Sequence, residues 1–285
     1  MKHFRKKRRI LTSALVLFLF AAVWWGNTSL ETDEYIFSSA RLPAGFDGLR
    51  IVQLSDLHGR HFGARDERLL AAVAAAEPEL IVLTGDFVDE HSTAAELETL
   101  LRGLAALAPV YYVTGNHEWG AHRAAETVAA FSQYGVTCLQ NEFVTLERNG
   151  DAIVLAGIHD PNGYADQKTP EQLAAEVRAA SADPFWLLLA HRNNLFNGHY
   201  CRLGADLTFS GHAHGGIWRL PFTDGLIDSG MTLFPSFTNG FYRCTDEDCA
   251  GAEVFVSRGL GNSPRWLPRL FNCPQVAVIT LEREE

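Results

Sequence analysis

The feature that most constrains the fold is a short apolar run that ends in a polar cluster, a pattern that recurs five times. Runs this apolar predict strands that are covered on both faces. The first three alternate with helical stretches, and this β-α-β-α-β order predicts a parallel sheet with helices packed outside it. The pairs of run and cluster are LRIVQL with SDLHG, ELIVLT with GDFVD, PVYYVT with GNHEWG, FWLLLA with HRNN, and DLTF with SGHAHGG.

Start and stop signals place the remaining elements. Helices are expected at Arg65–Ala76, from a cap at Ser92 or Thr93 to about Leu107, at His122–Tyr134, and from the Thr169-Pro170 pair onward. Strands are expected at Val144–Glu147 and Ile153–Ala156, joined by the turn signal Asn149-Gly150, and at Ala252–Ser257 and Gln275–Leu281. We therefore expect one α/β domain of mixed sheets without an internal boundary.

The first thirty residues differ sharply from the rest of the chain. Six lysines and arginines lie between Lys2 and Arg9, and Ile10–Trp25 is free of charged residues. A basic start followed by an apolar run is typical of a signal sequence or a membrane anchor. As a helix the run spans roughly 24 Å, slightly less than the hydrocarbon core of a bilayer. Because no small-x-small cleavage site follows, the sequence favours an uncleaved signal anchor over a cleaved signal peptide.

The distribution of charged residues predicts the membrane topology and disfavours nucleic acids as partners. By the positive-inside rule the basic end of a single-pass cell-membrane protein stays in the cytoplasm, and the rest lies on the extracytoplasmic side. A cleaved signal would make the protein secreted. We expect the anchor at residues 1–30, a linker with an opening strand at 31–48, and the folded domain at 49–285. Beyond the basic end, 18 Lys/Arg face 34 Asp/Glu, a net charge of −16 that disfavours nucleic-acid binding.

The cysteines carry a weaker signal. The five are too scattered along the sequence to predict a zinc cluster. Cys244 and Cys249, in CTDEDC, could form a loop disulfide outside the cytoplasm.

The polar clusters all follow predicted strands, which is where α/β folds build their sites. Together they supply carboxylates, imidazoles and one amide, a set that suits Zn, Mn or Fe better than Mg or Ca. The set is too large for one ion, but two ions about 3.5–4 Å apart that share a carboxylate would use it, as in phosphoryl hydrolases. Its members are Asp56 and His58; Asp86 and Asp89; Asn116, His117 and Glu118; His191; and His212 with His214.

This ordered set resembles the calcineurin-like metallophosphoesterase superfamily, whose blocks appear here as DLH, GDFVD, GNHE, AHRNN and GHAH. The resemblance implies a sandwich of two mixed β-sheets flanked by helices, here preceded by a signal-anchor helix. It implies two divalent ions, Mn, Zn or Fe. The resemblance implies that Asp56, His58 and His214 hold the first ion and that Asn116, His191 and His212 hold the second. It implies that Asp86 bridges the two ions. It also implies that His117 lies at the scissile phosphate and that Asp89 orients His117.

At several positions this chain departs from the motifs of particular phosphatase classes within the superfamily. The Ser/Thr protein phosphatases have arginines at the positions where this chain has Glu90 and Thr114, which argues against that class. The purple acid phosphatases have a tyrosine ligand after the bridging aspartate. The corresponding segment of this chain, GDFVD, contains no tyrosine, which argues against that class too. Asn193 stands where proline often follows the fourth block's histidine, which leaves His191 as the ligand that the motif supports least. Glu118 is expected to brace its loop by hydrogen bonding rather than to contact substrate.

The anchor and the SRGLG segment make the chain similar to the bacterial membrane-associated branch of the superfamily. This similarity implies hydrolysis of a phosphodiester or pyrophosphate by a metal-activated hydroxide, on a lipid-linked substrate such as UDP-2,3-diacylglucosamine. The alternatives are a non-enzymatic scaffold with this fold, a phosphomonoesterase or a nuclease.

Four further features have two interpretations each. His61 and His159 could reach substrate or be ordinary loop histidines, and Arg258 could bind phosphate or a strand-end carboxylate. The segment Pro264–Phe271 could touch lipid headgroups or pack across the core.

Overall fold

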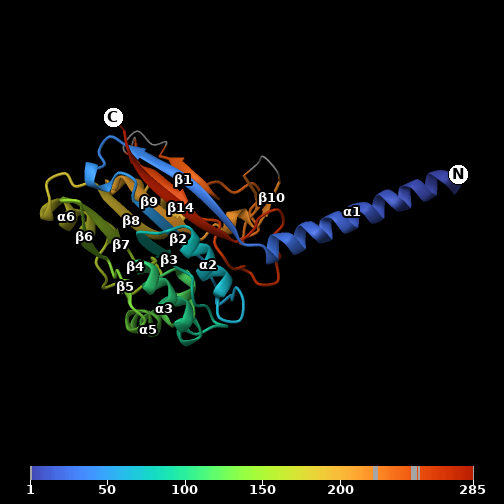
Figure 1. The fold of residues 1–285 in the computed structure, drawn as a ribbon, viewed down its shortest axis with the longest axis horizontal. Coiled ribbons are helices and arrows are strands. Elements are labelled where there is room, and N and C mark those ends of the chain that lie inside the picture. The colour runs from blue at the N-terminus through green and yellow to red at the C-terminus, as the bar shows by residue number, and fades with distance from the viewer. Residues whose placement is uncertain (1, 221–223, 245–248, 250, 285) are drawn as a thin grey trace.

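The computed structural model describes residues 2–220, 224–244, 249 and 251–284, and it shows two large sheets packed face to face (Figure 1). The first sheet contains the three alternating strands that the sequence predicted, parallel to one another, while β14 runs antiparallel to β2. In spatial order its strands are β1 (Glu31–Ser39), β14 (Gln275–Arg283), β2 (Arg50–Leu54), β3 (Leu80–Thr84), β4 (Val110–Val113) and β5 (Val136–Cys138).

The second sheet is also mixed. Its centre is parallel, from β7 through β8 and β9 to β13, and an antiparallel strand closes each edge. Asn149 and Gly150, both with positive φ, turn β6 into β7 as the sequence predicted. The strands in spatial order are β12 (Gly240–Arg243), β13 (Glu253–Val256), β9 (Leu207–Gly211), β8 (Trp186–Arg192), β7 (Asp151–Gly157) and β6 (Glu142–Arg148). A small pair, β10 (Trp218–Arg219) with β11 (Gly225–Ile227), lies apart.

Helices cover the outer face of each sheet and complete the layers. The largest apolar cluster lies between the first sheet and its helices, a second fills the space between the sheets, and a third lies beneath α6. The helices are α2 (Glu67–Ala75), α3 (Glu98–Leu107) and α5 (Ala124–Gln133) on the first sheet, and α6 (Pro170–Ala180) on the second. The predicted sandwich of two mixed sheets flanked by helices is confirmed.

Two helical details differ from the sequence prediction. Thr93 does start the second predicted helix, but its first turn is a separate 3-10 turn, Ala94–Leu97, before α3 begins. A short helix that was not predicted, α4 (Asn116–Gly120), follows β4 directly. Its single turn is too short to show a helical period in the sequence.

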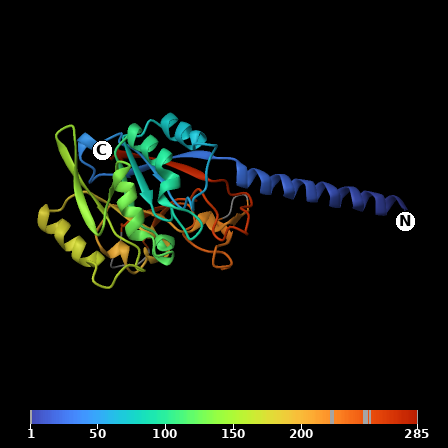
Figure 2. The same ribbon diagram turned by 90° about the horizontal axis from the view of Figure 1, so that it is seen from below.

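The N-terminal helix α1 (Lys2–Thr28) projects away from the domain (Figures 1 and 2). Its Phe4–Thr28 stretch is long and apolar enough, by length and composition, to cross a membrane. The C-terminal part of the helix contacts the domain: Phe18 contacts Phe271 with ring centroids 5.9 Å apart, and Asn27 hydrogen-bonds with Arg269. Phe271 and Arg269 belong to the segment Pro264–Phe271, which therefore packs against the helix.

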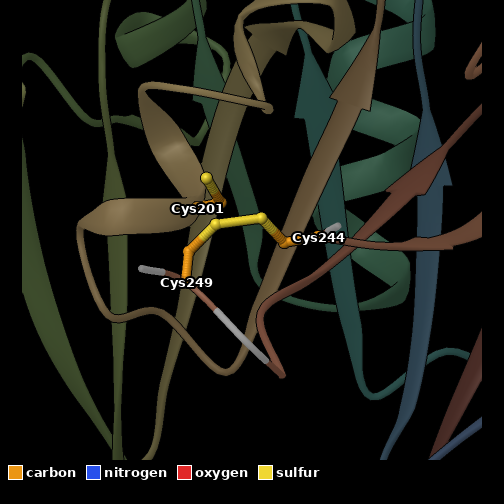
Figure 3. Close-up of side chains that lie close together, drawn as sticks. All are labelled: Cys201, Cys244 and Cys249. Carbon is orange, nitrogen blue, oxygen red and sulfur yellow. A yellow bond between two sulfur atoms is a disulfide. The ribbon is translucent and has the colours of Figure 1, made fainter. Parts of the chain in front are cut away.

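Cys244 and Cys249 form a disulfide, and the buried thiol of Cys201 lies beside it (Figure 3). The three sulfur atoms lie within 4.8 Å of one another. The fold thus brings Cys201 beside this pair although it is distant in sequence. Because two of the three sulfur atoms are joined in a disulfide, the three do not form a zinc-binding thiolate cluster. Residues 245–248 of CTDEDC lie outside the described residues.

Candidate metal centre

All seven predicted metal ligands lie at the carboxyl ends of strands, where the edges of the two sheets meet. This placement follows from parallel strands, because their carboxyl ends share one edge of a sheet. Asp56 and His58 follow β2, Asp86 follows β3, Asn116 follows β4, His191 lies near the end of β8, and His212 and His214 follow β9.

The first group of ligand atoms comes from Asp56, His58 and His214. Nε2 of His214 lies 3.3 Å from Nε2 of His58 and 3.6 Å from Oδ1 of Asp56. All three side chains are buried. Metal–ligand bonds of about 2.0–2.2 Å place neighbouring ligand atoms roughly 3–3.5 Å apart, so this group has the dimensions of a coordination sphere.

The second group centres on His191. Its Nε2 lies 3.1 Å from Oδ1 of Asn116, 3.2 Å from Nδ1 of His212 and 3.2 Å from Oδ2 of Asp86. The same Oδ2 of Asp86 lies 3.8 Å from Nε2 of His58. A single carboxylate oxygen therefore faces both groups.

His191 is oriented for ligation although its motif supports it least. Its Nδ1 lies 2.8 Å from the carbonyl oxygen of Thr84, which can only accept a hydrogen bond. Nδ1 therefore donates a proton to this carbonyl, and Nε2 faces Asp86 and Asn116, where it could ligate an ion that displaces its proton. The asparagine at position 193 does not disturb this arrangement, because its side chain donates to the carbonyl of Phe237.

The backbone at the site is strained. Positive φ is uncommon outside glycine and clusters at functional sites, where the surrounding structure enforces it. Five predicted ligands have it: Asp56 at 52°, His58 at 50°, Asp86 at 55°, His212 at 68° and His214 at 49°. Gly85 at φ 85° precedes the shared carboxylate, and a Cβ there would lie 2.7 Å from Nδ1 of His191.

Burial and the neighbouring charges shift the pKa values of the carboxylates and imidazoles in the site, often in opposite directions. Burial would raise the pKa of Asp86, but the charges of His191, His58 and His117 hold it well below its ordinary value. Burial would lower the pKa of His191, but Asp86 and Asp56 raise it to about 10. Burial and the neighbouring charge of His191 lower the pKa of His212 to about 3. Asp86 thus stays ionised beside His191, whose second proton a divalent cation would have to displace, while His212 stays neutral. Burial raises the pKa of the other buried carboxylate ligand candidate, Asp56.

Glu118 braces the loops that carry the site, as expected from the sequence. Its two oxygens accept hydrogen bonds from the backbone N–H groups of Asp86, Phe87, Val88 and Gly115 at 2.6–3.1 Å. Burial and the charge of Asp86 raise its pKa to about 7. The carboxylate therefore fixes the turn after β3 against the turn after β4 and does not contact the centre of the site.

His117 lies at the rim of the site. Its backbone N–H donates to Oδ1 of Asp86 at 2.8 Å, and its ring meets that of His58 edge-on, with centroids 4.7 Å apart. Nε2 lies 3.3 Å from Oγ of Ser263, and Nδ1 lies 3.6 Å from Oε2 of Glu90. The imidazole is partly exposed and accessible to a substrate.

Asp89 does not have the position that the resemblance implied. Its Oδ2 lies 3.7 Å from Nδ1 of His58, and Nη2 of Arg265 donates to both carboxylate oxygens at 3.0 Å. The turn after β3 and the charge of Arg265 direct the carboxylate towards His58. The acidic side chain beside His117 is instead Glu90, so the predicted pairing of Asp89 with His117 is wrong.

The C-terminal segment supplies site residues that sequence reasoning missed. Arg265 donates to the carbonyl oxygen of His58 as well as to Asp89, and Ser263 reaches His117. The only sequence feature that distinguished this segment was the basic, apolar composition of PRWLPRLF. Composition could not show that the segment crosses the metal centre. Arg265 and Asp89 are 176 positions apart in the chain.

His61, His159 and Arg258, for which the sequence allowed two interpretations each, have partners away from the metal centre. Nδ1 of His61 lies 2.9 Å from Asp66, and Nδ1 of His159 lies 2.7 Å from Oγ1 of Thr114. Arg258 forms ion pairs of 2.8 Å with Glu31 and Asp33, which supports its interpretation as a strand-end salt bridge.

Cavities adjoin both sides of the centre. One of about 370 Å³ adjoins His212 and is lined mainly by asparagines, serines and threonines, with Asp228 as its charged residue. The other, of about 290 Å³, adjoins His58 and contains two arginines; its lining residues are Asn27, His58, Gly59, Arg60, Asn262 and Arg265.

Comparison with known proteins places the chain in a family. The calcineurin-like phosphoesterase pattern matches residues 49–216. An uncharacterized metallophosphoesterase of Bacillus subtilis, YkuE, is 30% identical over 263 residues, covering 89% of this chain and 86% of its own. A transmembrane protein with a metallophosphoesterase domain from Bos taurus is 32% identical, covering 68% and 48% of the two chains.

Among solved structures, a dimetal phosphatase from Danio rerio aligns with 13% identity over 75% of this chain and 88% of its own, with a TM-score of 0.41. From the sequence matches, this chain belongs to the calcineurin-like phosphoesterase family.

Proposed function

We propose that this protein is a dinuclear metal-dependent phosphoesterase that hydrolyses phosphodiester or pyrophosphate bonds. The observation that carries the proposal is the position of Oδ2 of Asp86, which lies 3.2 Å from Nε2 of His191 and 3.8 Å from Nε2 of His58. One carboxylate oxygen between two groups of nitrogen and oxygen donors is the arrangement that a pair of ions needs.

Each metal position has its own set of donors. Asp56, His58 and His214 would hold one ion, and Asp86 would bridge to the other. The second ion would lie on Asn116, His191 and His212, which contribute one oxygen and two nitrogens. Such a mixed set suits Mn, Zn or Fe. When bound, the ions polarise phosphoryl oxygens and lower the pKa of water at the site.

The chain's own side chains would carry the remaining tasks. His117, partly exposed at the rim, would stabilise charge on the phosphoryl group or give a proton to the leaving oxygen. Asp89 would act through His58, because it faces the ring nitrogen that points away from the metal centre. Asp89 is therefore a positioning residue in this proposal.

The substrate is proposed to be membrane-borne. The net charge of −16 beyond the basic end opposes extended nucleic acids. Exposed apolar side chains such as Leu15, Phe18 and Phe20 cover α1, which supports a membrane anchor at residues 1–30 ahead of a catalytic domain at 49–285. A lipid-linked diester or pyrophosphate such as UDP-2,3-diacylglucosamine fits both features. The six basic residues and the Cys244–Cys249 disulfide support an extracytoplasmic catalytic domain.

Metal content and activity should be measured together on the purified full chain and on Asp86→Ala. The wild type should bind two ions and hydrolyse at least one of bis-p-nitrophenyl phosphate, a phospholipid or a nucleotide-linked lipid. Hydrolysis of p-nitrophenyl phosphate alone would favour the phosphomonoesterase alternative. Asp86→Ala should lose activity and most metal, because both ions lose a ligand. Asp166→Ala, at an exposed position, is the matched control and should behave as wild type. Two ions retained in Asp86→Ala would refute the bridge, and a metal-loaded wild type inactive on every substrate would refute the function.

A further inference from the structure

The cavity beside His58 is walled partly by the end of the apolar helix. Asn27 of α1 lines it together with Arg60, Asn262 and Arg265. We propose that this cavity holds a second phosphate group of the substrate, next to the phosphate that is hydrolysed and presented from the membrane surface. This inference rests on the proposed function and names the substrate class as a lipid that carries two neighbouring phosphates.

Arg60 supports an anionic occupant because its charge has no anionic partner in the part of the chain that the structure describes. Its guanidinium donates to the carbonyl oxygens of Leu260 and Asn27 and lies over the ring of Phe62, 4.8 Å from the centroid. Among the described residues, no carboxylate lies within 4.0 Å of it. A partly buried cation without a counter-charge is costly, and an anion in the adjoining cavity offsets that cost.

Two further arginines lie on this side of the centre. Arg265 lines the cavity and donates to Asp89 and to the carbonyl oxygen of His58. Arg269 is fully buried nearby and donates to the carbonyl oxygens of Gly261 and Arg258, and burial lowers its pKa to about 9. Arginine forks match the geometry of phosphate oxygens. A local cluster of this kind is notable in a domain whose net charge is strongly negative.

The end of α1 is fixed to the cavity. Oδ1 of Asn27 accepts hydrogen bonds from Nδ2 of Asn262 at 2.9 Å and from the backbone N–H of Arg269 at 3.1 Å, and Nδ2 of Asn27 donates to the carbonyl of Arg269 at 2.8 Å. The preceding Gly26 lets the chains approach, since a Cβ there would lie 3.1 Å from the Arg269 carbonyl oxygen.

The same helix end marks the level of the membrane surface. Trp24 and Trp25 are exposed there, and tryptophans at the end of a membrane-spanning helix lie at the headgroup level. Lipid phosphates lie at that level too. A phosphate held by Arg60 and Arg265 would therefore be one that a lipid presents beside His58, while the adjoining phosphate occupies the metal centre.

The first test measures binding without catalysis. Inorganic pyrophosphate is titrated calorimetrically into metal-free full-length protein in detergent, with Arg60→Gln as the test variant. Arg68→Gln is the matched control, because Arg68 donates to the Thr28 carbonyl of the same helix end at 2.9 Å but does not line the cavity. Loss of a charge-assisted hydrogen bond should weaken binding about 10-fold in Arg60→Gln and leave Arg68→Gln within about twofold of wild type. Arg60→Lys, which keeps the charge, should recover part of the affinity.

Equal affinity in wild type and Arg60→Gln, or no binding to wild type, would overturn the proposal. The source of the phosphate is tested by titrating dioctanoyl phosphatidate against inorganic phosphate. The lipid phosphate should bind more tightly because α1 adjoins the cavity, and equal affinities would overturn the membrane origin.

The second test separates this inference from the proposed function. With metal-loaded enzyme, KM is compared between a soluble pyrophosphate diester, UDP-glucose, and bis-p-nitrophenyl phosphate, which has no second phosphate. The KM for UDP-glucose divided by the KM for bis-p-nitrophenyl phosphate should be about 10-fold higher in Arg60→Gln than in the wild type. A metal-loaded wild type that hydrolyses neither compound, nor a phospholipid or nucleotide-linked lipid, contradicts the proposed function. Hydrolysis of both compounds with an unchanged KM ratio in Arg60→Gln contradicts only the second-phosphate site.

Discussion

At the scale of single residues, Asp86 shows how one side chain is held between two groups of histidines. Its Oδ1 accepts the backbone N–H of His117 at 2.8 Å, which turns Oδ2 towards His58 and His191. The residue before it, Gly85, has φ 85°, and a Cβ there would lie 2.6 Å from the backbone nitrogen of Gly115. The turn thus needs glycine for both its conformation and its close approach to the neighbouring strand end.

His117 should be required for turnover and not for metal binding. We expect His117→Ala to keep two ions while kcat falls by about 10²–10⁴-fold, the range for a lost general acid or electrostatic group. The loss should shrink with a good leaving group if proton donation dominates and persist if charge stabilisation dominates. Single-turnover rates on diesters with two leaving groups, with elemental analysis, provide the check. His199→Ala, at an exposed position, is the control.

Asp89→Asn provides the contrast to His117→Ala. Because Asp89 faces Nδ1 of His58, its replacement should lower metal affinity by about 10–100-fold, with kcat largely restored at saturating metal. A fall in kcat that saturating metal does not restore would return Asp89 to the role of orienting His117. Loss of one ion in His117→Ala would make that histidine a ligand.

At the scale of elements, the first two segments of the chain have different tasks. The long helix α1 projects from the domain and contacts it through its C-terminal part, whereas β1 pairs with β14 along its whole length, from Glu31 with Gln275 to Ser39 with Arg283. Phe37 of β1 is buried in the core between the sheets. The anchor is therefore separable from the sandwich, and β1 is part of it.

Two truncations test this division. Deletion of residues 2–28 should give a soluble, folded protein that still hydrolyses bis-p-nitrophenyl phosphate, because no metal ligand lies there. Deletion of residues 2–40 should abolish cooperative unfolding, because it removes an edge strand and uncovers β14. Circular dichroism melts and activity of both proteins are the measurement. A folded 2–40 deletion would show that β1 is dispensable, and a folded but inactive 2–28 deletion would show that α1 is needed for catalysis.

At the scale of the whole molecule, the candidate metal centre lies where the two sheets meet. β2, β3 and β4 of the first sheet and β8 and β9 of the second all contribute donors at one edge of the sandwich. Ions bound there would cross-link the layers in the native state alone, because the donors come from distant parts of the chain. Ligand binding to the native state stabilises it by mass action.

Metal removal should therefore lower thermal stability. At a free Mn²⁺ concentration of 100 times Kd, each ion contributes about 2.7 kcal/mol to the free energy of unfolding, so Tm should rise by about 5 °C or more above the chelator-treated protein. Calorimetry with and without Mn²⁺ measures this difference. Asp86→Ala should show little of the rise, and an equal rise in that variant would place the stabilising ions elsewhere.

Local signals in the sequence determined much of the fold. Apolar runs predicted the central strands, Asn149-Gly150 predicted the hairpin, and Thr169-Pro170 predicted the start of α6, where Thr169 caps the N–H of Gln172. The residues proposed as ligands could also be selected from the sequence, because each lies at or within a few positions of the end of a strand and parallel strands bring such ends together. Hydrophobic period, caps and turns all act over a few residues, so they can be recognised without knowledge of the fold.

Only the tertiary structure decided how the site is assembled across the sheets. It directs Asp89 to His58 instead of His117, brings Arg265 and Ser263 over the centre, and fixes Asn27 of α1 at the wall of a cavity. Arg265 and the carbonyl of His58 are 207 positions apart, and Asn27 and Arg269 are 242 apart. Contacts at such separations depend on how two sheets and a long loop pack together, and local sequence patterns carry no information about that packing.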